Sequence, residues 1–293
     1  MPTPIGPWPC SRLGAVADRT VVVTGAASGI GAATAARLTR AGWRVIGVDK
    51  DEFDIVADLG TPEGRRRAVE ESAARCGGSL AGIVTCAGQA GMPGRPGSQL
   101  SAVNYFGTVE VLEGLRPLLG AGAAAIAISS NSTTVQPAIP ADLVEACLQH
   151  DEALSARLAD EHGSLAAYPA TKLALAHWVR REATGPQWAG AGLRLNAVAP
   201  GMIDTPMVAE IRADPEAGPL LDFLPSPSAG PAGPKRSRRW WSSCWGPTPA
   251  SSAGRSSFAT AAATPSCAHG TGPPPGTSRC ATSATRLPDP LTR

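Results

Sequence analysis

The sequence predicts an α/β fold, a doubly wound parallel sheet forming a single domain with an irregular C-terminal tail. The first observation behind this prediction is the apolar run Val21–Val23, which leads directly into Gly25, Gly29 and Gly31. The second is that strand-like and helix-like segments alternate between residues 29 and 225, as in a parallel sheet with helices on both faces. The third is a change of composition after about Pro225, beyond which no further strand can be drawn.

The turn after the first strand is the element around which the chain is organised. Three β-branched valines suit a strand that is buried on both faces. Gly25, Gly29 and Gly31 allow a tight turn and a close approach to a ligand, because they carry no Cβ. A helix predicted over residues 29–41 directs its unpaired N–H groups and positive dipole end at the same point. The turn therefore predicts an anion site, although spaced glycines also occur in ordinary turns.

A second strand, residues 43–49, ends in Asp49, which lies 18 positions beyond Gly31. A Rossmann-like dinucleotide-binding unit places an acid at about this position to bind the adenosine ribose hydroxyls. The alternative is an acid that only caps a turn. A carboxylate here repels a 2′-phosphate, and Ala26, Ala27 and Ser28 provide no positive charge to attract one. NAD is therefore favoured over NADP.

The remaining elements follow in alternation. Thr61 caps a helix over residues 63–75, and Pro62 stands where its missing N–H costs nothing. Further strands are predicted at residues 53–57, 80–85, 123–129 and 193–198. Further helices are predicted at residues 101–118 and 168–184. Each crossover between parallel strands is expected to be right-handed.

Composition limits the possible partners. The net charge is +2, but eight of the 26 basic residues and only one of the 24 acidic residues follow Pro225, so the body of the chain is mildly acidic. This balance argues against nucleic acid as a partner. No apolar run is long enough for a membrane span, and seven cysteines without a CxxC pair or a signal peptide indicate the cytoplasm. The histidines form no metal-ligand spacing, and residues 1–18 are interpreted as a Pro-rich N-terminal extension.

Several motifs together resemble the short-chain dehydrogenase/reductase family, from about Thr20 to about Phe223. Residues 24–31 match its TGxxxGxG turn, and residues 200–206 are similar to its Pro-Gly-x-x-x-Thr segment. The resemblance implies that the catalytic residues are Asn104, Ser130, Tyr168 and Lys172. It implies that the dinucleotide is bound by Gly25, Ser28, Gly29, Ile30, Gly31, Asp49, Asp58, Leu59, Cys86, Ala87, Gly88, Tyr168, Lys172, Pro200, Gly201, Ile203 and Thr205. No metal is implied.

The residue types suit alcohol and carbonyl chemistry. Tyr168 and Lys172 lie at positions i and i+4 of a helix and therefore share a face. The Lys172 ammonium and an oxidised nicotinamide are expected to lower the pKa of the Tyr168 phenol, so that it can exchange protons near neutral pH. Ser130 would hydrogen-bond the substrate oxygen, and Asn104 would help to seat a water. Ser129 is the neighbouring alternative, while Cys86 is interpreted as a small filler rather than a nucleophile.

Residues 131–167 form an insertion, because 38 positions separate Ser130 from Tyr168 where the family has a shorter link. Residues 141–161 are helix-forming and are expected to lie over the substrate mouth or the neighbouring helices, where they could block a tetramer interface. A similar insertion marks the bacterial 3α-hydroxysteroid dehydrogenase/carbonyl reductase subgroup. The resemblance thus implies a small hydrophobic alcohol or ketone substrate, with steroids as candidates, and a homodimer if the C-terminus is intact.

Residues 226–293 do not match the family. They contain no Val, Ile, Met or Tyr and only two Leu, and the segment is basic. One interpretation is a disordered low-complexity tail, and another is a nucleic-acid or membrane segment around residues 235–245. We favour a third hypothesis, an out-of-frame translation, because GC-rich codons for residues 234–251 can encode an amphipathic helix in another frame. DNA sequencing tests it. Without a further helix and strand, the sixth strand is predicted to be an unprotected sheet edge.

Two functions remain at this stage. The first is an NAD(H)-dependent oxidoreductase that interconverts a secondary alcohol and a carbonyl compound within residues 19–225. The second is a non-catalytic dinucleotide-binding or interaction protein with a basic tail. The combination of Asn104, Ser130, Tyr168 and Lys172 favours the first.

Overall fold

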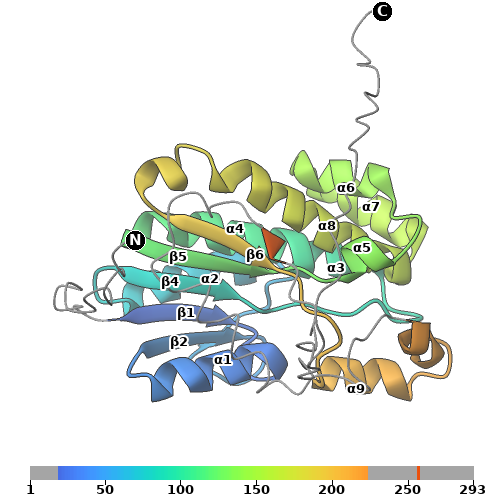
Figure 1. Ribbon diagram of the computed structural model, residues 1–293, viewed down its shortest axis with the longest axis horizontal. Coiled ribbons are helices and arrows are strands. Elements are labelled where there is room, and N and C mark those ends of the chain that lie inside the picture. Colours follow the sequence, from blue (N-terminus) through green and yellow to red (C-terminus); the bar gives the residue numbers. More distant parts are fainter. Residues whose placement is uncertain (1–18, 224–255, 258–293) are drawn as a thin grey trace, which may run out of the picture. The chain divides into compact units, whose positions relative to one another are not determined.

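A seven-stranded, entirely parallel sheet forms the centre of the computed structural model, which describes residues 19–223 and 256–257 (Figure 1). The strand order is β3-β2-β1-β4-β5-β6-β7. The bounds are β1 Thr20–Thr24, β2 Arg44–Asp49, β3 Ile55–Val56, β4 Leu80–Thr85, β5 Leu119–Ile128, β6 Arg194–Val198 and β7 Ser256–Ser257. The order reverses between β1 and β4, and such a switch point leaves a crevice at the carboxyl ends of the strands. The α/β prediction is confirmed.

The two faces of the sheet are covered by different helices. Val21 and Val23 pack on one face with Ile30 and Leu38 of α1 (Gly29–Arg40). Val22 points to the other face, where the larger core includes Leu112 of α4 and Trp178 of α8. This alternation follows from the two-residue period of a strand. The helices of the larger face are α2 (Pro62–Arg75), α4 (Gly107–Leu115) and α8 (Ser164–Ala183).

The predicted insertion contains three short helices, α5 (Ser132–Val135), α6 (Ala141–Leu148) and α7 (Glu152–His162). Helices α6 and α7 pack on α8, and α7 also packs on α3 (Gly97–Leu100), as Figure 1 shows. The buried Arg65 of α2 connects α7 to the helices beneath it, because its guanidinium pairs with Glu110 of α4 and Glu152 of α7. The insertion therefore lies over neighbouring helices of the larger face.

Three predicted boundaries were wrong. Helix α8 begins at Ser164 rather than at residue 168, so Pro169 lies inside the helix, where it supplies no N–H for the Leu165 carbonyl. Strand β5 begins at Leu119, because Leu119 pairs with Leu80 before a register shift. The helix predicted over residues 101–118 is divided into a π-helical segment, Ser101–Phe106, then α4 and a 3₁₀ turn, Arg116–Leu118.

The absence of a strand beyond β6 was also predicted, and this is wrong. Ser256 and Ser257 pair with Ala197 and Val198, so the edge of β6 has a partner over two residues. Strand pairing uses backbone groups, and a serine pair can therefore join a sheet without apolar side chains. The other predictions for residues 1–18 and 226–293 lie outside the described residues. Within the described part of the chain, no helix is long and apolar enough to span a membrane.

Candidate active site

The glycine turn between β1 and α1 is shaped by close backbone contacts. Gly25 has a φ of 64°, and a Cβ there would lie 2.7 Å from the Ala87 nitrogen. A Cβ on Gly31 would collide with the Gly25 carbonyl oxygen. The first turn of α1 contains no acidic side chain, and Ser28 makes no capping hydrogen bond. The helix N–H groups therefore face an open cradle, which fits the pyrophosphate of a dinucleotide.

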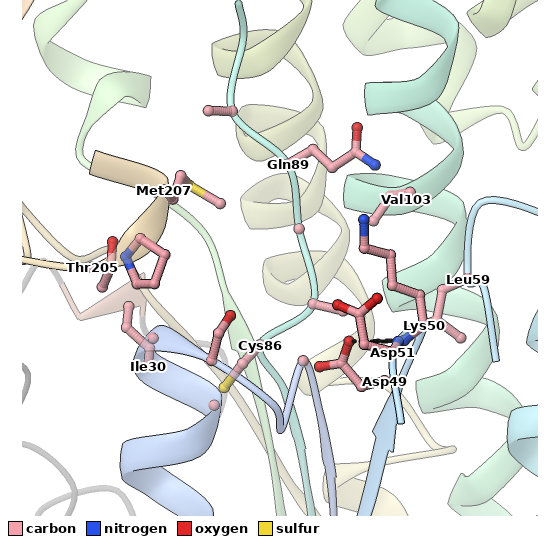
Figure 2. A pocket seen from close by; sticks show the side chains of 18 of the residues that line it. Ile30, Asp49, Lys50, Asp51, Leu59, Cys86, Gln89, Val103, Thr205 and Met207 are labelled. Carbon is pink, nitrogen blue, oxygen red and sulfur yellow. Dashed lines mark hydrogen bonds between the residues drawn. The ribbon is translucent and has the colours of Figure 1, made fainter. Parts of the chain in front are cut away.

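Asp49 closes the other side of this cradle. Its carboxylate accepts hydrogen bonds from the backbone N–H groups of Ala27 at 2.9 Å and Lys50 at 2.8 Å. Both bonds fix the carboxylate at the carboxyl end of β2, beside the glycine turn. Asp51 lies next to it (Figure 2). The residues present thus fit a bound dinucleotide with its adenosine ribose at this end.

A cavity of about 530 Å³ extends from these acids across the carboxyl ends of the strands. Figure 2 shows Asp49, Lys50 and Asp51 at one end, Ile30, Thr205 and Met207 at the other, and Cys86 between them. Twelve of the predicted residues line it, namely Gly25, Ser28, Gly29, Ile30, Gly31, Asp49, Asp58, Leu59, Cys86, Ala87, Gly88 and Thr205. Lys50, Asp51, Gln89, Val103, Arg95, Met207 and Glu210 also line it and were missed.

A second cavity of about 200 Å³ adjoins the first, and the two share wall residues that include Ile30, Cys86 and Thr205. Predicted residues that line it are Ile30, Cys86, Gly88, Ser130, Tyr168, Lys172, Pro200, Gly201, Ile203 and Thr205. Much of the remaining wall is apolar, with Leu165, Met202, Val208, Ile211, Leu220 and Leu221. The sequence did not indicate these residues, because they come from three separate segments.

The two adjacent serines after β5 have different partners. The Ser129 hydroxyl is buried and donates a 2.8 Å hydrogen bond to the Lys172 carbonyl, which joins β5 to α8. The Ser130 hydroxyl lies on the second cavity and hydrogen-bonds the Tyr168 side chain. Only Ser130 therefore has its hydroxyl beside the phenol.

The pKa of Tyr168 is raised, because burial of the phenol disfavours its charged form, while the hydrogen bond with Ser130 lowers it. In the chain without a dinucleotide, Lys172 is not among the causes of this shift, and the predicted lowering by Lys172 together with an oxidised nicotinamide stays a prediction. The Lys172 ammonium donates a 2.9 Å hydrogen bond to the Ile128 carbonyl, and burial lowers the pKa of Lys172 to about 8. Burial opposes ionisation of both groups, and this outweighs their i, i+4 proximity.

Asn104 is the one predicted site residue that lines neither cavity. It is fully buried in the π-helical segment, where its amide accepts from the Gln89 N–H at 2.8 Å and donates to the Gln89 carbonyl at 3.0 Å. A Cβ on Gly88 would lie 3.0 Å from the Asn104 oxygen and 3.4 Å from the Lys172 nitrogen. Asn104 thus fixes the loop after β4 beside the lysine. Its predicted role in seating a water stays a prediction.

Cys86 lines both cavities and hydrogen-bonds the Thr34 side chain. Burial raises the pKa of its thiol to about 12, so the thiolate is scarce at neutral pH. This agrees with the interpretation of Cys86 as a filler rather than a nucleophile. Among the described residues, no group of three or more His, Cys, Asp or Glu side chains is arranged to hold a metal.

The geometry defines a class of protein, a dinucleotide-binding α/β domain with a tyrosine and a serine hydroxyl on an adjoining apolar cavity. The sequence pattern of the short chain dehydrogenase family matches residues 19–140 and 156–216, more than half of the chain. The chain belongs to this family. Its match is interrupted at residues 141–155, within α6, α7 and the turn between them.

Individual relatives agree with this assignment. Over 212 residues the chain is 36% identical to the 3-alpha-hydroxysteroid dehydrogenase/carbonyl reductase of Comamonas testosteroni, covering 70% of this chain and 81% of the relative. It is 34% identical to the cis-4-hydroxycyclohexanecarboxylate dehydrogenase of Sinomonas cyclohexanicum, covering 69% and 80%. The 3-alpha-hydroxysteroid dehydrogenase from Pseudomonas sp. B-0831, solved with NADH, is 38% identical with a TM-score of 0.76, covering 82% and 94%.

These relatives and the site identify an oxidoreductase that interconverts an alcohol and a carbonyl compound with a nicotinamide dinucleotide. The alternative of a non-catalytic binding protein is not favoured.

Proposed function

We propose that the chain oxidises a secondary alcohol on a hydrophobic ring system, and reduces the corresponding ketone, with NAD(H) as its cofactor. The observation that carries this proposal is the hydrogen-bonded pair of Ser130 and Tyr168 on an apolar cavity that adjoins the glycine cradle. The named activities of the Comamonas and Sinomonas relatives support a cyclic alcohol, and 3α-hydroxysteroids are the first candidates.

NAD rather than NADP is supported by the charges at the ribose end of the first cavity. Asp49 and Asp51 both line this end. The Asp49 carboxylate is held by the Ala27 and Lys50 N–H groups and cannot easily turn away from a 2′-phosphate. Lys50 is the basic side chain nearest in sequence, and it stands between two acids. The NADH in the Pseudomonas structure agrees with this proposal.

The proposed catalytic roles follow from the positions of the side chains. The dinucleotide, when bound, accepts or supplies the hydride. Tyr168 takes the alcohol proton during oxidation and returns a proton to the nascent alkoxide during reduction. Ser130 donates a hydrogen bond to the substrate oxygen and stabilises the charge that develops on it. Lys172 would hold the nicotinamide ribose through its buried ammonium, and Pro200, Gly201 and Ile203, which line the second cavity, would lie beside that ribose.

Oligomerisation is part of the proposal. Helices α6 and α7 cover α8 on the larger face of the sheet. A partner subunit that approached the larger face would therefore meet the insertion rather than α8. We propose a dimer in which α6 and α7 still cover α8.

Replacement of Tyr168 by Phe tests the proposed reaction. The oxidation of a 3α-hydroxysteroid, followed by NADH absorbance, should fall about 10³-fold in kcat/KM because the proton acceptor is lost. Binding of NADH should persist within about twofold, since only the phenol oxygen is removed and the glycine turn and Asp49 of the first cavity are unchanged. His177→Phe on the same helix is the matched control. Turnover retained in Tyr168→Phe would refute the proposed role.

A further inference from the structure

An ion pair lies in the wall of the first cavity. Arg95 lies in the loop between β4 and α3, and Glu210 lies in α9 (Pro206–Ala213). The Arg95 guanidinium donates to the Glu210 carboxylate at 2.7 Å, and both residues line the cavity. The two positions are 115 residues apart in the sequence. The contact therefore joins two separate segments of the cavity wall.

The Arg95 side chain is held in place by its own loop. A second guanidinium nitrogen donates to the Ala90 carbonyl at 2.7 Å, and only 21% of the side chain is exposed. Glu210 is less constrained, since its side chain is 51% exposed and has no second protein partner in the described residues. The Arg95 side chain is thus held in place without Glu210, whereas the Glu210 carboxylate can leave the contact more easily.

The loop that carries Arg95 is also fastened to the catalytic helix. Ser164, the first residue of α8, exchanges two hydrogen bonds with the Met92 backbone. Met92 is buried against Ala217 in an apolar cluster with Met207 and Ile211 of α9. The loop therefore has one attachment to α8, four residues before Tyr168, and another to α9.

Helix α9 carries residues that close both cavities. Met207 lines the first and the second, and Thr205, which caps the helix, lies against Gly29 of the glycine turn. A dinucleotide in the cradle would be covered by this segment. Movement of α9 away from the β4–α3 loop would require the contact between Arg95 and Glu210 to break.

We propose that Arg95 and Glu210 form a clasp that holds α9 across the dinucleotide cavity and so slows release of the bound dinucleotide. Both are positioning residues, since they act through α9. The proposal rests on the proposed NAD(H) binding. A single, partly exposed ion pair contributes weakly, so the clasp delays release and does not prevent it.

Stopped-flow release of NADH from the full chain, with excess NAD as the trap, tests the clasp. Glu210→Gln should release NADH about 1.5- to 5-fold faster, the range for one exposed ion pair. Arg95→Gln should release it at least as fast, because the Ala90 contact is lost too. The double variant should be no faster than Arg95→Gln, and the KM for NAD should rise without a fall in kcat.

The matched controls are Arg67→Gln and Glu71→Gln, which break an equally short ion pair on α2, where neither residue lines either cavity. They should leave release unchanged. The ratio of the Glu210→Gln and wild-type rates should approach one in about 1 M salt, where charges are screened. If the pair were merely structural, Glu210→Gln would lower thermal stability but would not change the rate of NADH release in a salt-dependent way.

Two results would overturn the clasp. Release rates of Glu210→Gln equal to those of Glu71→Gln would show that the pair does not hold α9. Slower release in Glu210→Gln, with faster release in Arg95→Gln, would show that Arg95 binds the dinucleotide directly and that Glu210 competes for it. A wild-type chain that binds no NADH would instead refute the proposed function, and the clasp with it.

Discussion

The two adjoining cavities are built in different ways. The first depends on the backbone, with its N–H groups, its positive φ angles and a glycine turn within seven residues of sequence. The second depends on side chains from β5, the insertion, α8 and α9, which meet only in the folded chain. The glycine turn of the first cavity is a local motif, whereas the wall of the second cavity is assembled from segments that are far apart in the sequence.

The largest expected effect concerns the two serines. Ser130→Ala should lower kcat by about 10²- to 10³-fold, because a hydrogen-bond donor to the reacting oxygen is lost. Ser129→Ala should leave kcat within a few-fold and lower the free energy of unfolding by about 1 kcal/mol, since its bond to the Lys172 carbonyl is structural. Steady-state kinetics and urea unfolding measure both. Equal losses of kcat would break the distinction between a cavity serine and a buried one.

The ionisation of Lys172 sharpens the comparison through pH. Burial lowers its pKa to about 8 from 10.5, so between these values the unfolded chain binds the proton more strongly than the folded chain. The free energy of unfolding should therefore rise by about 3 kcal/mol from pH 8 to 10.5, relative to Lys172→Met. Lys50→Met, on the first cavity, is the control for loss of a lysine. Parallel stability curves for wild type and Lys172→Met would contradict the lowered pKa.

The backbone origin of the first cavity is tested by two glycines with similar φ. A Cβ on Gly25 (64°) would meet the Ala87 nitrogen, while a Cβ on Gly192 (72°) would have nothing within 4 Å. Alanine at Gly192 should lower the free energy of unfolding by about 1 kcal/mol because of backbone strain. Alanine at Gly25 should cost about 2 kcal/mol more and weaken NADH binding. Urea unfolding measures the stability of each variant, and fluorescence titration measures NADH binding. Equal losses of stability in the two variants would show that the close contact with the Ala87 nitrogen does not exclude a Cβ at Gly25.

The smallest expected effect is a shift in the pKa of one tyrosine phenol. The chain has two tyrosines, Tyr105 and Tyr168, and burial raises the pKa of both. Phenolate absorbance should therefore appear only above pH 10 in the chain alone. Saturating NAD should lower one transition by at least about one pH unit, because the cationic ring favours phenolate nearby. The shift should vanish in Tyr168→Phe; its persistence there would assign it to Tyr105.

The fold was predictable because its signals are local. Apolar runs, the Thr61 cap and the glycine turn each depend on a few consecutive residues, and α2 begins where the cap placed it, with Thr61 accepting from the Gly64 N–H at 3.0 Å. The start of α8 was missed because proline favours the first turn of a helix, so Pro169 suggested a start near residue 168. The helix instead begins directly after Gly163. Strand β7 was missed because its pairing leaves no apolar pattern.

By itself, the sequence determined the parallel sheet, the cradle for a dinucleotide and the residue types proposed for the chemistry. Tertiary structure decided which serine faces the phenol, buried that phenol and so raised the pKa of Tyr168 in the chain without a dinucleotide, and brought Arg95 to Glu210. The physical reason is range. Backbone conformation and periodicity are set by neighbours along the chain, whereas exposure to water and charge pairing are set by whichever distant segments pack together.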